Sequence, residues 1–154
     1  TLDMTPSLWA SLLGYNDLVD FFMKEKGEII TVYKNEIGMT ALILASLCGH
    51  HEIVQKLVAG DYANYSVNFI CHRVMTALSF ACAYGHLDCV RILIQVKNIK
   101  INASTYGETA LMIACYENNV ECVRCLAQAE GIDINAVDLN KRTALMSVCK
   151  TGNV

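Results

Sequence analysis

Residues 76–94 read Thr-Ala-Leu-Ser-Phe-Ala-Cys-Ala-Tyr-Gly-His-Leu-Asp-Cys-Val-Arg-Ile-Leu-Ile, a pattern that predicts two short helices separated by a turn at Gly85 and His86. The same pattern begins at four other threonines. Successive copies stand 35, 36, 33 and 34 residues apart, and they start at Thr5, Thr40, Thr76, Thr109 and Thr143. A period of this length is typical of stacked repeat proteins, in which each unit buries its apolar face against its neighbours.

Length and composition are those of one folded domain with a large apolar core. The 154 residues are 54% hydrophobic and 18% charged, against about 25% charged in an average protein. A net charge of −3 with scattered lysines and arginines argues against nucleic acid as a partner. The longest uncharged apolar stretch, residues 37–49, is shorter than the ~18 residues of a membrane span, so we expect no membrane insertion.

The eight cysteines follow the repeat and resemble packing residues. Cys82 falls where other copies have Ser11 and Ser46, and Cys89 falls where they have Leu18 and Ile53. A thiol that alternates with serine or an aliphatic residue behaves as a small buried group. Free thiols predict a reducing environment, so we expect an intracellular and cytoplasmic protein. A metal or redox site built from these cysteines remains a weaker alternative.

The repeats define a single domain over residues 1–154. Its units span approximately residues 1–34, 35–70, 71–103, 104–137 and, as a partial copy, 138–154. Because the last copy lacks a second helix, we expect the chain either to continue in a longer protein or to fray at that end. The connection over residues 27–39 is predicted to be an extended arm or hairpin, and residues 61–66 hold the extra length of the second unit. The helices are expected at residues 7–13, 17–26, 41–48, 52–58, 77–84, 87–95, 110–117, 120–128 and 144–150.

The unit Thr-Ala-Leu-x-x-Ala-x-x-x-Gly-His, closed by Gly-Ile-Asp-Ile-Asn-Ala-Val-Asp at residues 131–138, resembles the ankyrin repeat. Four full copies and one partial copy carry the resemblance over essentially the whole chain. It implies an all-α solenoid of stacked antiparallel helix pairs with projecting hairpin loops. The ends of the first helices and the hairpin tips would then form a concave groove.

Departures from the family pattern predict local differences. The histidine usual near the start of each unit is replaced throughout, so the hydrogen bonds that it makes between family loops are not expected. Val74 and Lys141 stand where the family prefers glycine before the threonine, and a β-branched valine resists positive φ, so an irregular hairpin is predicted before Thr76. Asn118 and Asn119 replace Gly-His in the fourth unit, and asparagine tolerates a left-handed turn.

No arrangement of residues predicts catalysis or a cofactor. His50 and His86 occupy the family's turn position, where a structural role explains them. His51 and His72 lie near other possible ligands, but no second ligand pair stands at matching spacing. Cys122-x-x-Cys125 lies within a predicted helix, which is not the setting of a thiol–disulfide motif. The expectation is a protein that is not an enzyme and has no catalytic, cofactor-binding or metal-binding residue.

The resemblance instead predicts a non-catalytic protein-interaction module, or scaffold, that binds a segment of a partner protein in the groove. We expect an extended or helical segment of another protein, an apolar N-terminal half of the groove and a polar C-terminal half. The competing interpretation is that the leucines only pack against neighbouring repeats. The predicted contact residues are Leu12, Leu13, Ile37, Met39, Leu47, Arg73, Met75, Tyr84, Tyr106, Glu108, Tyr116, Glu117 and Arg142.

A rival hypothesis makes the chain the regulatory or targeting segment of a longer enzyme, such as a protein kinase. The isolated domain is expected to be monomeric. The identity of the partner does not follow from the repeats, because a fold does not fix a function.

Overall fold

A computed structural model describes residues 3–26, 33–59, 66–72 and 75–151. Its elements are short helices that come in pairs, with one two-stranded hairpin. The bounds are α1 Pro6–Leu13, α2 Asn16–Lys26, α4 Ala41–Cys48, α5 His51–Val58, α7 Ala77–Ala83, α8 Leu87–Ile94, β1 Ser104–Thr105, β2 Glu108–Thr109, α9 Ala110–Tyr116, α10 Val120–Ala127 and α11 Ala144–Thr151.

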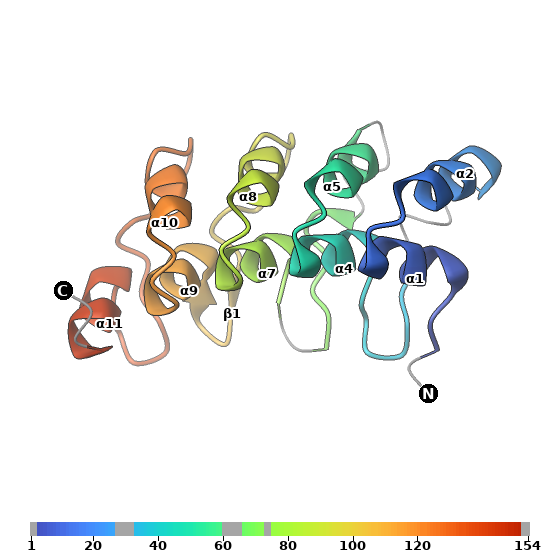
Figure 1. The fold of residues 1–154 in the computed structure, drawn as a ribbon. Coiled ribbons are helices and arrows are strands. Elements are labelled where there is room, and N and C mark those ends of the chain that lie inside the picture. The colour runs from blue at the N-terminus through green and yellow to red at the C-terminus, as the bar shows by residue number, and fades with distance from the viewer. Residues whose placement is uncertain (1–2, 27–32, 60–65, 73–74, 152–154) are drawn as a thin grey trace.

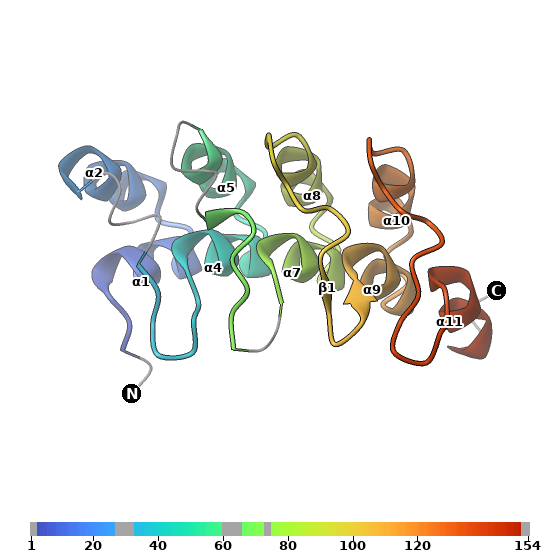
Figure 2. The ribbon, with the colours of Figure 1, turned by 180° about the vertical axis from the view of Figure 1, so that it is seen from behind.

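The helices form two parallel rows, which Figure 1 shows from one side and Figure 2 from the other. One row contains the first helix of each unit, α1, α4, α7, α9 and α11, and consecutive members pack against each other. The second row contains α2, α5, α8 and α10, each packed on the first helix of its own unit and on its neighbours. The loops before α4, α9 and α11 project to one side of the first row. This arrangement confirms the predicted all-α solenoid.

Each first helix begins at the repeated threonine because that side chain caps it. The hydroxyl oxygen of Thr76 accepts the backbone N–H of Ser79 at 3.1 Å, and Thr40 accepts that of Ile43 at 3.2 Å. The other threonines bond in the same way, Thr109 to Met112 at 3.3 Å. Such a cap satisfies one of the four N–H groups that have no partner within the helix.

The first helices of units one to four end in a left-handed turn. Gly14, Gly49 and Gly85 have φ values of 78°, 77° and 72°, which glycine adopts at no steric cost. Asn118 takes the same place in the fourth unit with φ at 57°, so the expected asparagine turn is confirmed. Every expected helix boundary agrees with the structure to within one residue, and the caps explain the limits of the first helices α1, α4, α7 and α9.

Two predictions about connections can be judged only in part. Residues 27–32 of the expected extended arm, residues 61–65 of the extra length in the second unit, and Arg73 and Val74 lie outside the described residues. Lys34 and Thr40 pair as an antiparallel bridge, and β1 pairs with β2 in a register that places Thr105 opposite Glu108. Lys141 adopts the left-handed conformation with φ at 60° although it is not glycine.

Asparagines bridge consecutive units on the side away from the hairpins. The Asn68 side chain donates to the carbonyl oxygen of Asn98 at 2.8 Å and accepts the N–H of Lys100 at 2.7 Å. One unit later, Asn102 donates to the carbonyl oxygen of Gly131 at 2.7 Å and accepts the N–H of Asp133 at 2.9 Å. Each amide therefore satisfies both a donor and an acceptor of the following loop, which fixes the spacing of the units at this edge.

The apolar core runs the length of the stack, between the two rows. Leu42, Leu78 and Leu111 occupy one repeat position, and each is at most 3% exposed. At the same position in the last unit, Leu145 is 73% exposed, because no second helix covers α11 within the described residues. Within the described part of the chain, no helix is long and apolar enough to cross a membrane.

This contrast gives a test of the stack with a matched control. Leu111→Ala should lower the free energy of unfolding by about 2–5 kcal/mol, the usual cost of a cavity at a buried leucine. Leu145→Ala should change it by less than about 0.5 kcal/mol, since the side chain is exposed. Urea unfolding followed by circular dichroism measures both; equal losses would contradict the described core.

Candidate binding surface

Neighbouring units are joined by a hydrogen bond from a turn residue to the preceding unit. The Nε2 atom of His50 lies 3.0 Å from the carbonyl oxygen of Leu12, and Nε2 of His86 lies 3.0 Å from that of Leu47. Because a carbonyl oxygen only accepts, Nε2 carries the proton in both histidines. The bonds satisfy carbonyl groups at the ends of first helices, which have no partner within the helix. The predicted structural role of both histidines therefore has a defined physical basis.

The glycine of each turn leaves the space in which this side chain lies. A Cβ atom on Gly14 would stand 2.7 Å from His50, and one on Gly49 would stand 2.6 Å from His86. Asn119 replaces histidine in the fourth unit and donates to the carbonyl oxygens of Cys82 and Ala83 at 2.7 and 3.0 Å. The bonded carbonyls fix the ends of α1, α4 and α7, which carry several of the predicted contact residues.

Six of the predicted contact residues are exposed, on what we call the hairpin–helix surface: the ends of α1, α4, α7 and α9 and the hairpins before them. Tyr84 and Tyr116 are 59% and 60% exposed at the ends of α7 and α9. Tyr106, at the tip of the β1–β2 hairpin, is 73% exposed. The exposed set is Leu13, Tyr84, Tyr106, Glu108, Tyr116 and Glu117.

Other predicted residues are less available to a partner. Leu12, Ile37, Leu47 and Met75 are half-buried against the core. Met39 is 4% exposed and belongs to the core, because its N–H bonds the buried Asn35 side chain at 2.9 Å at the base of the loop. Arg73 lies outside the described residues. The N-terminal half of the surface therefore exposes fewer apolar side chains than the sequence predicts.

Arg142 is partly exposed but already has a carboxylate partner. Its guanidinium donates to Oδ2 of Asp138 at 2.7 and 2.9 Å, while Oδ1 accepts the backbone N–H groups of Arg142 and Asn140 at 2.8 Å each. The backbone N–H and then the guanidinium of Arg142 hold the pKa of Asp138 below its usual value. The same bonds fold the loop over Lys141 and explain its left-handed backbone.

Sequence reasoning missed a set of exposed apolar residues at the N-terminal end of the stack. Leu18 is 47% exposed, whereas Ile53, Cys89 and Cys122 at the same position are at most 1% exposed against a preceding unit. The sequence signal for the exposure of Leu18 is its alignment with Ile53, Cys89 and Cys122, combined with its place in the first unit. Trp9, Tyr15 and Phe21 are also exposed there.

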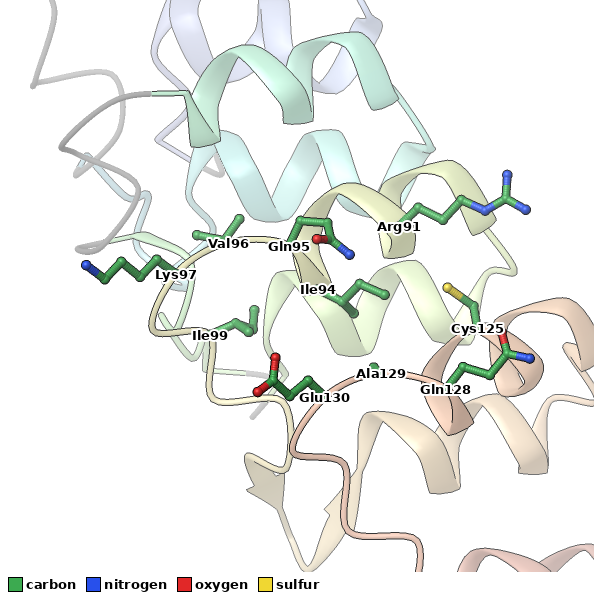
Figure 3. A pocket seen from close by; sticks show the side chains of 10 residues that line it. All are labelled: Arg91, Ile94, Gln95, Val96, Lys97, Ile99, Cys125, Gln128, Ala129 and Glu130. Carbon is green, nitrogen blue, oxygen red and sulfur yellow. The ribbon is translucent and has the colours of Figure 1, made fainter.

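Two clefts lie elsewhere on the stack. Figure 3 shows the first, about 550 Å³, between the ends of α8 and α10, with Arg91, Cys125 and Glu130 among its lining side chains. No histidine, aspartate or hydroxyl side chain lines it. The second, about 430 Å³ and mostly apolar, lies between α10 and α11, where Leu145 is exposed.

Burial disfavours ionisation of the Cys82 and Cys89 thiols. Burial raises the pKa of Cys82 well above its usual value, and burial followed by the nearby Asp88 raises that of Cys89 to about 11. A thiol must ionise to act as a nucleophile or metal ligand. Among the described residues, no group of three or more histidine, cysteine or acidic side chains is placed to hold a metal ion.

Stacked helix pairs with capping threonines, glycine turns and projecting hairpins define a helical repeat protein. Family models agree: a model of three ankyrin repeats matches residues 63–138, and a single-repeat model matches residues 37–70. The chain belongs to the ankyrin repeat family. Ankyrin repeats are protein-interaction modules, so the chain is a module of this kind.

Three plant proteins resemble the chain over 90 residues. The E3 ubiquitin-protein ligase XBAT33 of Arabidopsis thaliana is 30% identical, and the probable E3 ubiquitin-protein ligases XBOS33 and XBOS32 of Oryza sativa subsp. japonica are 36% and 34% identical. Each match covers 58% of this chain but only 16% or 17% of the relative. The similarity is therefore confined to a small part of each ligase.

The bonds between units predict a specific rescue. His86→Ala should lower the free energy of unfolding by about 1–3 kcal/mol, because the Leu47 carbonyl loses its partner. His86→Asn should recover part of this loss, since Asn119 makes the equivalent bonds in the next unit. Urea unfolding checks both, with the exposed His51→Ala as control. Equal stability of the alanine and asparagine variants would contradict the role of the bond.

The Asp138 loop should depend on pH. Because the folded pKa of Asp138 is lowered, its stabilising effect is present above the unfolded value of about 3.9 and is lost as pH falls through the folded pKa. Hydrogen exchange should show protected Asn140 and Arg142 amides at pH 7 and reduced protection factors in Asp138→Asn. The difference between variant and wild type should shrink in acid. Asp17→Asn, at an exposed carboxylate on α2, should leave both amides unchanged.

Proposed function

We propose that the chain binds a segment of a partner protein through the hairpin–helix surface. The observation that carries the proposal is a set of exposed side chains at one repeat position, Leu13 in the first unit, Tyr84 in the third and Glu117 in the fourth. The second unit has the half-buried Cys48 at this position. The ends of α1 and α7, which carry Leu13 and Tyr84, are fixed by hydrogen bonds to the next unit, so this part of the surface is preformed. A rigid surface loses little conformational entropy on binding, which favours recognition of a flexible segment.

The chemistry of the surface changes along the stack. The first unit offers Leu13, an exposed aliphatic side chain, and the third and fourth units offer Tyr84, Tyr116 and Glu117. Tyrosine is common among the side chains that dominate binding energy at interfaces. We infer an extended or helical partner segment with an apolar anchor toward the first unit and polar contacts toward the fourth. No cofactor is needed for such binding, and the free thiols suit a reducing cytoplasm.

A second candidate function is the targeting segment of a longer enzyme. It is favoured by the three relatives, which are named as ubiquitin ligases and which the chain matches over about one sixth of their length. In that case the repeats would select the protein on which a catalytic part acts. Sequencing the complete transcript that encodes the chain distinguishes the two, since a catalytic domain in the same reading frame supports only the second.

The first proposal predicts a face-specific loss of binding. The chain immobilised on beads should retain a defined set of proteins from a cell extract, and Leu13→Glu combined with Tyr84→Ala should remove it. Gln128→Ala, on the opposite side at the cleft of Figure 3, should retain the set. All three substituted residues are exposed, so the fold is expected to survive, and circular dichroism verifies this. Loss of the retained proteins with Gln128→Ala alone would contradict the proposal and place the interface at the cleft of Figure 3.

A further inference from the structure

Five exposed residues of the third and fourth units form what we call the tyrosine–glutamate patch: Tyr84, Tyr106, Glu108, Tyr116 and Glu117. Tyr84 and Glu117 occupy the same repeat position in consecutive units, and the helices that precede them, α7 and α9, pack side by side. The hairpin that carries Tyr106 and Glu108 leads directly into α9. The patch therefore combines three aromatic rings and two carboxylates on adjoining elements.

The ring of Tyr84 is held in place by the bond between units. It stacks on the His86 ring, with centroids 6.3 Å apart and planes inclined by 14°. His86 is itself fixed by its bond to the Leu47 carbonyl. One face of Tyr84 is thus supported while the side chain remains 59% exposed, so a planar group can stack on it without first ordering it.

Two exposed glutamates give the patch its negative charge. Glu108 and Glu117 form no ion pair within the described part of the chain. In the following hairpin, Arg142 is neutralised by Asp138, which leaves the exposed Lys141 as the cation there. The patch therefore offers aromatic faces and negative charge together.

We propose that the tyrosine–glutamate patch binds an arginine side chain of the partner segment. This inference rests on the proposed function and specifies its chemistry. A guanidinium is planar, always charged and weakly hydrated, so it stacks on a tyrosine ring while donating to a carboxylate. A lysine ammonium carries the same charge but cannot stack as a plane or bond a carboxylate through two parallel N–H groups.

The test selects dodecapeptides from a random phage-displayed library on the immobilised wild-type chain. Selected peptides should be enriched in arginine over lysine, and a selected peptide should bind in fluorescence anisotropy. Its affinity should fall about fivefold in Tyr84→Ala and by a similar factor when its arginine is replaced by lysine. Glu117→Gln combined with Glu108→Gln should weaken binding and reduce its dependence on salt.

The control variant is Glu130→Gln, which removes a carboxylate at the outer cleft of Figure 3 and should leave the affinity unchanged. Peptides that bind without arginine, or that are enriched in acidic residues, would overturn this inference and leave the proposed function standing. Loss of peptide binding in Leu13→Glu without any loss in Tyr84→Ala would also overturn this inference and leave the proposed function standing. Recovery of no peptide above background would count against both.

Discussion

The stack depends on one repeated interaction, the hydrogen bond from a turn side chain to the last carbonyl groups of the preceding first helix. His50, His86 and Asn119 each make it, although imidazole and amide differ in size and shape. The bond works only where the preceding turn is glycine, since a Cβ atom on Gly85 would stand 2.8 Å from the Asn119 oxygen. Glycine therefore has two roles, one in the left-handed backbone and one in the packing of the next unit.

The repeat also accepts substitutions at positions that the family pattern specifies. Asn118 replaces glycine in the fourth unit and keeps the left-handed conformation, with φ at 57°. The family's usual histidine near the start of each unit is absent, and Leu8, Ile43, Ser79 and Met112 stand there instead, all buried. Leu8, Ile43 and Met112 pack in the apolar core at that position. The Ser79 hydroxyl instead forms a hydrogen bond with that of Thr76 at 3.0 Å.

The fold was predictable because its signals are local and repeated. Thr76 and Gly85 mark the limits of a first helix by capping chemistry alone, and five copies of the pattern give the register of the rest. The site was predictable only in part. Exposure of Tyr84 and Tyr116 follows from the repeat position, but burial of Met39 depends on its hydrogen bond to Asn35, which repeat register does not specify. The spacing of four residues between Asp138 and Arg142 is compatible with their ion pair. The same spacing also occurs between charged residues that do not pair, so it does not predict the contact.

The asparagine bridges through Asn68 and Asn102 and the histidine bonds act at different edges of the stack and hold successive units at a constant separation. Packed helices lie about 9 Å apart, and a polyproline II segment advances about 3.1 Å per residue with three residues in each turn. Side chains three residues apart on such a segment therefore face the same way and are separated by about one unit of the stack. A partner segment bound in this conformation would present every third side chain to the repeat position of Tyr84 and Glu117.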